Sequence, residues 1–486
     1  MSRHFFAETG FDRNRILAWI YRLQVKGLEM NIPKNLLLFA ALVICFLLPS
    51  SAGAEFNFTP GFALSEEYND NVFLTAKNRK SDFITTINPS FNIYYDRESL
   101  NLFLDYGFRY LLYANNSEDD KMYHNVNLQS TIRPFRDYVF IKVSDFFSRV
   151  PIDERRAVGY ENNLANMTNS NVFSVNPYIE YPFSSTFRAR AGYTYQNTWY
   201  EDRDGIDSQD HTAGIMLTKE LAARLNTSLG YSYLFHRPYG EEYKYDEYDR
   251  QDVYLSLSYG VTEKLSLDGS AGWVAFRYGE HSGRNDFSAV NWSASARYLL
   301  TAAVALRAGY ARNYTDSYSR TGVTALSPQS ATQSIIYPGE GYITIGDQTI
   351  PTSMVLLDSI NGGLNRNDSI NLGFAYSGKI PFAVTGFHNI SKYMNIDREN
   401  RSTGVILSGS VPISSMLTAQ FAGNYSYNKY LPENEKVNRY GARLALDYKL
   451  RIITLTLGYA FNKEDSNIDT ADYVNNVVWL GAKLVF

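Results

Sequence analysis

The sequence predicts an all-β protein, a transmembrane antiparallel up-and-down β-barrel of about 20 strands with 18 as the second choice. Three observations support this prediction. Apolar and polar residues alternate in successive segments, short and long connections follow each other in turn, and the chain ends on an alternating segment with an aromatic last residue. Alternation places one apolar face against lipid, and closure leaves no strand edge unpaired.

The alternation recurs along most of the chain. In "TFRARAGYTYQNTWY", Phe187, Ala189 and Ala191 share one face of an extended strand, while Arg188 and Arg190 share the other. The same division appears in "LNLFLDYGFRYLLY", "VALRAGYARNY" and "IITLTLGYAF". Counting from Phe56 predicts the first strand in "FNFTPGFALSEEY" and a weakly patterned strand at 383–396. Such repeated two-residue periodicity is the signature of membrane-spanning β-strands.

The connections differ in length in a regular order. Short turns occur at 97–99, 136–137, 184–185, 262–263 and 414–415, and longer polar loops such as "EDRDGIDSQD", "EEYKYDEYDR", "PENEK" and "KEDSNIDTAD" lie between them. Bacterial outer-membrane barrels have short periplasmic turns and long extracellular loops. An even number of strands places both ends of the barrel in the periplasm.

Composition agrees with this fold. The chain has 39 Tyr, 29 Phe and 32 Gly, whereas 20% of its residues are charged. Tyr and Trp near strand ends are expected to form belts at the two membrane interfaces. The net charge of -4 gives no reason to expect nucleic acid as a partner.

A secretory signal peptide is predicted at the start of the chain. The apolar run from Asn35 to Pro49 is too short for a membrane-spanning helix of roughly 20 residues. The small residues Ala52 and Ala54 form a cleavage site after it. We therefore expect 1–54 to be an N-terminal extension with a cleaved signal peptide, and 55–486 to be a single barrel in the outer membrane of a Gram-negative cell. The single cysteine, Cys45, lies inside the apolar run, so the mature chain has no disulfide or thiolate site.

The faces opposite the apolar ones are expected to line the lumen. The predicted lumen-lining residues are Arg109, Arg133, Lys142, Arg188, Arg190, Arg297, Arg307, Arg443, Lys483, Asp105, Asp268 and Asp447. Because basic residues predominate, the lumen is expected to be cationic and to favour anionic solutes. The alternative is that cross-strand Arg and Asp pairs only hold the wall together.

The longest interruption of the pattern is 320–366, predicted to be an extracellular loop. Loops of this length are uncommon unless they are functional. It either folds into the barrel mouth as a constriction or forms an external hairpin. Single-channel conductance after deletion of 325–360 distinguishes the two, because unchanged conductance removes the constriction.

No cofactor, metal site or catalytic motif is predicted. The histidines are scattered singly, without metal-ligand spacing, and no GxSxG or phosphate-binding glycine motif is present. We expect the protein not to be an enzyme, although residues on neighbouring strand ends could form a catalytic site without a linear motif.

The segment Pro60–Asp96, "PGFALSEEYNDNVFLTAKNRKSDFITTINPSFNIYYD", resembles the opening of outer-membrane β-barrel proteins of the porin type that are associated with PEP-CTERM/exosortase and exopolysaccharide gene clusters. The final "VVWLGAKLVF" is similar to the signal by which the barrel-assembly machinery recognises its substrates, with Leu480, Leu484 and Phe486 as the residues that carry it.

The first resemblance implies a channel for exopolysaccharide export across the outer membrane. Two alternatives remain open: a general diffusion porin for small solutes, anionic ones included, and a structural sheath or docking barrel for a partner protein. The expected partners are outer-membrane lipid, the assembly machinery, and polysaccharide or small anions. Conductance in planar bilayers separates the alternatives, because a sheath conducts nothing.

Overall fold

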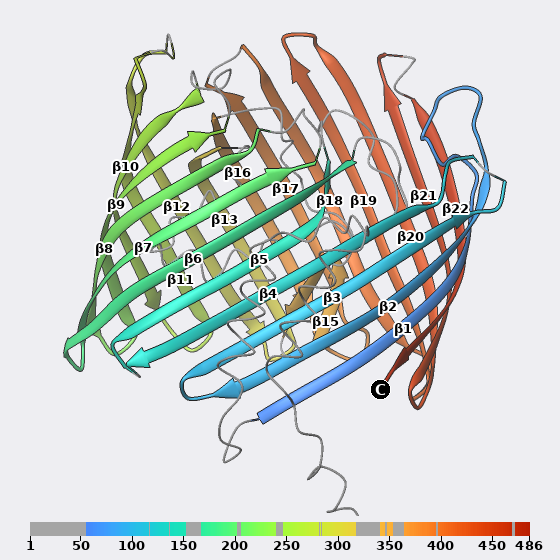
Figure 1. The fold of residues 1–486 in the computed structure, drawn as a ribbon, viewed down its shortest axis with the longest axis horizontal. Coiled ribbons are helices and arrows are strands. Elements are labelled where there is room, and N and C mark those ends of the chain that lie inside the picture. The colour runs from blue at the N-terminus through green and yellow to red at the C-terminus, as the bar shows by residue number, and fades with distance from the viewer. Residues whose placement is uncertain are drawn as a thin grey trace, which may run out of the picture. The chain divides into compact units, whose positions relative to one another are not determined.

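Backbone hydrogen bonding joins the alternating segments into one closed barrel. The computed structural model has a 20-stranded antiparallel sheet in which β1 pairs with both β2 and the last strand, β22 (Figure 1). The predicted fold class and the count of 20 strands are confirmed, and the alternative of 18 strands is wrong. Segment 383–396, the weakest in pattern, forms the regular strand β17 (Phe382–Tyr393).

The structure describes residues 55–115, 117–135, 137–151, 167–201, 206–239, 246–280, 282, 284–316, 341–345, 348–352, 364–394, 397–468 and 472–486. Over these residues, no helix is long and apolar enough to cross a membrane. The predicted cleavage residues Ala52 and Ala54 lie outside the described residues.

The strands of the wall follow one another in chain order, each antiparallel to the next. They are β1 (Glu55–Asn69), β2 (Asp82–Arg97), β3 (Leu100–Tyr113), β4 (Lys121–Phe135), β5 (Val139–Pro151), β6 (Met167–Ser184), β7 (Phe187–Tyr200), β8 (Ser208–Ala222), β9 (Leu225–Pro238), β10 (Tyr248–Gly260), β11 (Leu265–Tyr278), β12 (Phe287–Thr301), β13 (Val304–Asp316), β16 (Leu364–Tyr376), β17, β18 (Glu399–Pro412), β19 (Leu417–Leu431), β20 (Glu435–Leu450), β21 (Ile453–Ser466) and β22 (Tyr473–Val485).

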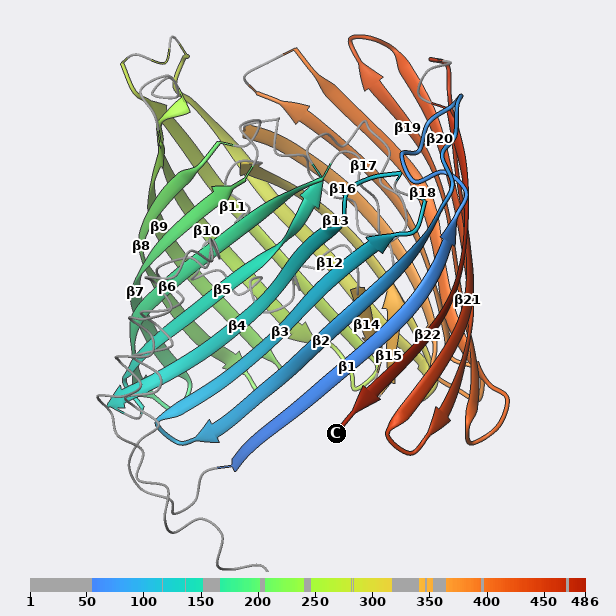
Figure 2. The same cartoon turned by 45° about the vertical axis from the view of Figure 1, so that its right-hand side comes forward.

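The connections are sorted between the two ends of the barrel. Tight turns at 98–99, 185–186, 223–224, 302–303 and 451–452 lie at the end where the C-terminus is marked, at the bottom in Figures 1 and 2. Longer connections such as 70–81, 114–120 and 201–207 lie at the opposite end. One predicted loop is wrong. The residues of "PENEK" do not form a long loop, because 432–434 is a tight turn and Glu435 and Lys436 already belong to β20. We call the two ends periplasmic and extracellular on the basis of this sorting.

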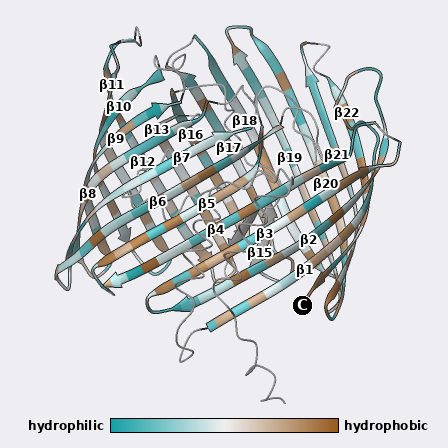
Figure 3. Cartoon of the chain, in the orientation of Figure 1, coloured by the Kyte–Doolittle hydropathy of each residue, from teal (hydrophilic) through white to brown (hydrophobic). Residues whose placement is uncertain are grey.

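Hydrophilic and hydrophobic residues are interspersed along the strands (Figure 3). Successive side chains of a strand point to opposite faces, and the register keeps paired residues on the same face around the barrel. One face exposes large apolar residues, among which Leu372 is 62% and Leu480 61% exposed. We call it the outer face, and the opposite face the lumen face. In a closed sheet, the backbone N–H and C=O groups form hydrogen bonds with neighbouring strands, and an apolar outer face can then contact hydrocarbon. The architecture is that of an outer-membrane barrel.

Buried apolar side chains on the lumen face form a core against the inner wall. Leu234, Tyr248, Val274 and Phe276 pack together on β9–β11, with Tyr314 and Leu364 from β13 and β16. The Arg250 guanidinium donates a hydrogen bond to the Tyr314 carbonyl at 2.9 Å, which brings the extracellular end of β13 over the inner face of β10. The wall is therefore thickened on this side near the extracellular end.

Only part of the segment 320–366 is described. Strands β14 (Gly341–Ile345) and β15 (Gln348–Thr352) form a separate antiparallel hairpin, and β15 lies beside β18 of the wall. In Figures 1 and 2 this hairpin lies within the outline of the barrel. The other residues of the predicted constriction loop before Leu364 lie outside the described residues, so the constriction stays a prediction.

The seam between β22 and β1 closes the barrel. Leu484 lies opposite Phe62, and Leu480 lies opposite Glu66 on the outer face. The amide of Phe486 donates the last hydrogen bond of the seam, to the carbonyl of Pro60 at 3.1 Å. Its ring is 64% exposed on the outer side. The predicted terminal strand is therefore present, whereas its role as an insertion signal stays a prediction.

Deleting Phe486 should lower the amount of barrel assembled in the outer membrane several-fold, because both the last seam hydrogen bond and the exposed terminal ring are lost. Assembly is measured by the heat-dependent gel shift of folded barrel, and conductance of the assembled fraction should be unchanged. Phe486→Tyr is the control, since it keeps both features. Normal assembly of the deletion would contradict the assigned role.

Candidate functional site

A basic patch lies on the lumen face of β4–β7, near the periplasmic turns. It consists of Arg133 on β4, Lys142 on β5, Glu180 on β6, and Arg188 and Arg190 on β7, which the strand registers place on one face. β-Sheet geometry explains why these residues meet. Alternate residues point the same way, so neighbouring strands that each carry a basic residue at similar height build one surface. The patch has four basic side chains and one carboxylate.

Glu180 is shared between two arginines. It lies directly opposite Arg190 in the register, and the Arg190 guanidinium donates to Glu180 Oε2 from Nε at 2.8 Å and from NH2 at 2.5 Å. The Arg188 NH1 group lies 3.6 Å from the other carboxylate oxygen, Oε1. The Arg188 side chain is 59% exposed, whereas that of Glu180 is 20% exposed. One carboxylate thus fixes two guanidinium groups but neutralises only one charge.

An aromatic platform adjoins these charges. The Tyr178 ring stacks on Phe140 with centroids 4.8 Å apart and an interplanar angle of 9°. The guanidinium carbon of Arg190 lies 4.5 Å from the Tyr178 ring centroid, and Lys142 Nζ lies 5.7 Å from it. Gly192 opposes Tyr178, and a Cβ at Gly192 would lie 2.8 Å from that of Tyr178. Glycine therefore permits the close approach that holds the platform against the wall.

A pair of arginines also lies on the lumen face of another part of the wall, on β12 and β13. Arg297 and Arg307 are directly opposite each other in the register and project from the same face. Two like charges at this spacing repel each other unless an anion lies between them. Both lie close to the periplasmic turn 302–303, as the basic patch lies close to the turn 185–186. The basic patch and the Arg297–Arg307 pair therefore both lie in the periplasmic part of the barrel.

All the residues predicted to line the lumen project from the lumen face. Besides those already placed, they are Asp105 and Arg109 on β3, Asp268 on β11, Arg443 and Asp447 on β20, and Lys483 on β22. The structure does not bring them together as one site. Arg133 donates to the Glu98 carbonyl at 3.3 Å and lines a small pocket with Asp96, Glu98 and Asp137, so acidic groups surround its charge.

Several of these residues have structural contacts. Asp447 accepts hydrogen bonds from Gln420 at 2.5 Å and Thr456 at 2.7 Å, and Asp268 accepts one from Ser258 at 2.7 Å. The Arg443 guanidinium lies 5.2 Å from the Trp479 ring centroid. The alternative that lumen charges hold the wall together therefore applies to these residues. Arg188 also contacts a carboxylate, Glu180 at 3.6 Å, but its side chain is 59% exposed and so remains accessible to a solute.

Tyr254 on β10 provides a further aromatic surface on the lumen face. It lies opposite Gly230 on β9, and a Cβ at Gly230 would come within 2.2 Å of the Tyr254 ring. The ring therefore lies flat across the strand of its neighbour and is only partly covered. Flat aromatic rings beside guanidinium groups suit ligands that have both a stacking surface and a negative charge.

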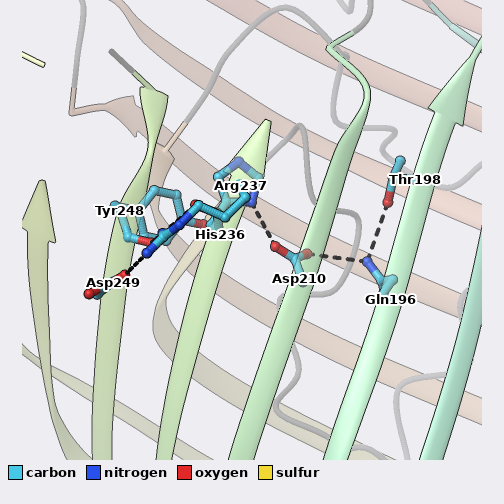
Figure 4. Close-up of polar contacts among 7 residues, drawn as sticks. All are labelled: Gln196, Thr198, Asp210, His236, Arg237, Tyr248 and Asp249. Atoms are coloured by element: carbon cyan, nitrogen blue, oxygen red, sulfur yellow. Dashed lines mark hydrogen bonds and ion pairs between the residues drawn. The ribbon is translucent and has the colours of Figure 1, made fainter. Parts of the chain in front are cut away.

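A buried polar chain crosses β7–β9 on the lumen face, nearer the extracellular end (Figure 4). Its centre is Asp210, whose Oδ1 lies 2.7 Å from His236 Nδ1 and whose Oδ2 lies 3.5 Å from Gln196 Nε2. Gln196 also contacts Thr198 Oγ1 at 3.4 Å, and the His236 ring stacks on Tyr248 with centroids 4.7 Å apart. Because a carboxylate only accepts, the imidazole proton lies on Nδ1.

This chain is too deeply buried to meet a solute. His236 is 0% and Asp210 3% exposed. Its members join neighbouring strands through side chains in a place where water does not reach, and each lost contact would leave a buried polar group unsatisfied. We therefore assign it to holding the wall, not to catalysis. No group of side chains suited to a metal ion occurs among the described residues.

Sequence reasoning missed the Asp210–His236 pair. The two residues are 26 positions apart, so no linear motif joins them. The available signal was that both fall on the polar face of consecutive predicted strands, where the register can bring them together. Sequence reasoning also missed the contacts of two histidines on the outer face: His124 contacts the Tyr106 hydroxyl group at 2.9 Å, and His211 contacts that of Tyr193 at 2.5 Å.

His236→Leu should lower the free energy of unfolding by about 2–3 kcal/mol, because it removes the main partner of a buried carboxylate. Unfolding in denaturant, followed by Trp fluorescence in lipid vesicles, measures the change. The control is His388→Leu, which removes a histidine from the outer face and should change stability by less than about 0.5 kcal/mol. Equal losses in both variants would contradict the assigned structural role.

Comparison with known proteins finds a likeness among solved structures only. The sequence matches no protein-family model and no curated protein. Among solved structures, it is similar to a mutant of the ferric enterobactin receptor PfeA of Pseudomonas aeruginosa, with a TM-score of 0.48, 11% identity, and coverage of 90% of this chain and 81% of that chain.

Other similar structures are the FrpB iron transporter of Neisseria meningitidis (TM-score 0.45, 11% identity, 88% and 81% coverage) and the ferric-catecholate import receptor Fiu of E. coli (0.42, 9%, 88% and 81%). At these identities the likeness concerns the barrel architecture alone. The resemblance to exosortase-associated proteins stays a prediction, because no family model matches.

Proposed function

We propose that the protein is an outer-membrane channel for anionic solutes, and that acidic saccharides are the class its lumen suits best. The observation that carries this proposal is the charge balance of the basic patch. Arg188 and Arg190 share the single carboxylate of Glu180, so an excess of positive charge remains beside the lumen. Fixed charge along a pore selects for ions of the opposite sign.

The second argument concerns the position of the charges. The basic patch on β4–β7 and the Arg297–Arg307 pair both lie near the periplasmic turns, so an anion at that end meets basic residues from two parts of the wall. Cations that face each other without an intervening carboxylate are stabilised by a passing anion. This arrangement supports attraction of anions at the periplasmic mouth, where an exported solute would enter.

The aromatic residues support saccharides over simple ions. Tyr254 lies flat against the wall where Gly230 allows close approach and is partly exposed to the lumen, whereas Tyr178 is only 7% exposed and holds Arg190 and Lys142 beside it. A sugar ring offers an apolar face to an aromatic ring, and a sugar acid adds a carboxylate that pairs bidentately with arginine. A lumen that offers both kinds of contact suits a chain of acidic sugars better than a small inorganic anion.

Export of exopolysaccharide is the finer form of this proposal, and it rests on the resemblance carried by Pro60–Asp96. Deleting the gene and quantifying acidic polysaccharide on the cell surface tests it, since export requires a loss of surface material. A general diffusion porin would leave surface polysaccharide unchanged but still conduct small anions. A structural sheath would do neither.

The double variant Arg188→Gln, Arg190→Gln should reduce anion selectivity in planar bilayers. We expect the chloride-to-potassium permeability ratio to fall by a factor on the order of two to ten at 0.01 M salt, where the Debye length is about 30 Å, and to fall less at 1 M. Reversal potentials in a KCl gradient measure the ratio.

The matched control is Arg237→Gln, Arg277→Gln, which removes two positive charges from the outer face of β9 and β11. The ratio should stay at the wild-type value in this variant. Equal ratios for the wild type and the lumen double variant would contradict a role for the basic patch in selectivity.

A further inference from the structure

The outer face carries a second set of basic residues, at the extracellular end of consecutive strands of the wall. Strands β13 and β16–β21, orange to red in Figure 1 except for the yellow β13, each contribute one basic side chain to this band. The residues are Arg312, Arg366, Lys392, Arg401, Lys429, Lys436 and Lys463. Except at Arg366, the register places this residue on the same face as the exposed apolar side chains. Arg366 is directly opposite Tyr314, whose ring packs into the core on the inner wall, so Arg366 is not counted among the residues that face lipid.

Three of these residues form a row at one height. Arg401 is directly opposite Lys429, and Lys429 is directly opposite Lys436, on the adjacent strands β18, β19 and β20. Opposed side chains on one face have Cβ atoms about 4.5–5.5 Å apart, and like charges there are destabilising. We call Arg401, Lys429 and Lys436 the cationic row. An anion bound over the row would remove the repulsion between its three positive charges.

Carboxylates neutralise other parts of the band but not the centre of the row. Asp368 lies 2.5 Å from Arg312 and 3.0 Å from Arg366, and Glu399 lies 2.5 Å from Arg401. Within the part of the chain that the structure describes, no carboxylate forms an ion pair with Lys429 or Lys436. Glu433 is in the turn between these two strands.

Tyrosines mark the membrane interface just below the row. Tyr425 and Tyr440 are opposite each other on β19 and β20, with ring centroids 5.1 Å apart. Each is four residues from the lysine of its own strand, or about 13 Å along the strand. Because tyrosine belts lie at headgroup level, the lysines reach the polar layer where lipid phosphates are found.

The opposite part of the wall lacks this feature. At the extracellular end of β7–β11, two arginines project from the outer face. Arg237 pairs with Asp249 at 2.8 Å, and Arg277 is opposite Asp249 in the register. The excess of positive charge on β18–β20 is therefore not repeated on β7–β11. A general requirement for solubility or for membrane insertion would not produce such an asymmetry.

We propose that the cationic row binds the phosphate groups of a phosphorylated glycolipid in the outer leaflet, and so fixes an annular lipid against β18–β20. This proposal rests on the outer-membrane location in the proposed function, but not on the solute or on the lumen. Each basic side chain can form a charge-assisted hydrogen bond with phosphate oxygens, and the acyl chains then pack on the exposed apolar residues below the tyrosines. Leu444 at 60% and Leu457 at 52% exposure lie on that surface.

The test uses the full-length barrel, purified in detergent and incubated with lipid A, a diphosphorylated glucosamine lipid. Native mass spectrometry measures how much lipid stays bound during delipidation. The triple variant Arg401→Gln, Lys429→Gln, Lys436→Gln should bind lipid A on the order of a hundredfold more weakly, because each basic residue near a lipid surface contributes about fivefold. The single variant Lys436→Gln should bind lipid A about fivefold more weakly than the wild type. It keeps the proposal testable if the triple variant does not fold.

The matched control is Arg224→Gln, Lys264→Gln, Arg451→Gln, which removes the same charge from exposed periplasmic turns. It should bind lipid A as the wild type does. Dephosphorylated lipid A should bind the wild type as weakly as lipid A binds the triple variant, and millimolar inorganic phosphate should not displace the lipid.

Retention of lipid A by the triple variant would overturn the proposal, as would equal loss in the control or displacement by free phosphate. The reversal potential of the triple variant is measured in parallel. It should equal that of the wild type, because the row is outside the lumen. A wrong lipid assignment and a wrong solute assignment therefore give different results.

Discussion

The closure of β22 on β1 is the constraint on which the rest of this structure depends. In hydrocarbon an unpaired backbone group costs several kcal/mol, so a sheet can span the membrane only if its last strand pairs with its first. Closure fixes the register of every strand between them. It thereby decides which alternate residues face lipid and which face the lumen, since a shift by one residue would exchange the two faces.

Closure also separates two electrostatic environments that the sequence interleaves. On β7, Arg188 and Arg190 face the lumen, whereas Ala189 and Ala191 of the same strand face outward. Likewise, Lys436 projects outward and Arg439 inward, where it pairs with Glu464 at 2.8 Å. A strand can therefore serve a pore with one set of residues and a lipid with the other. Neither set needs a dedicated domain, and each can be changed without disturbing the other.

Much of the fold could be predicted from alternation, because a period of two residues has only one structural meaning in a membrane. The faces of Arg297, Asp447 and Lys483 followed from it directly. The partners of these residues did not, because contact depends on the register of strands far apart in sequence. Asp210 with His236, Glu180 shared by two arginines, and the row of Arg401, Lys429 and Lys436 all depend on that register. Nor could sequence show that "PENEK" is divided between a tight turn and the start of a strand.

The division of the wall into a lumen face and a lipid face is the central claim, and cysteine labelling tests it most directly. No cysteine occurs in 55–486, so single substitutions at Leu455, Thr456 and Leu457 on β21 in that segment give clean reporters. In reconstituted barrels, Thr456→Cys should react with a charged, water-soluble thiol reagent, and Leu455→Cys and Leu457→Cys should react only with a lipophilic one. Uniform labelling of the three, or the reverse alternation, would contradict the account.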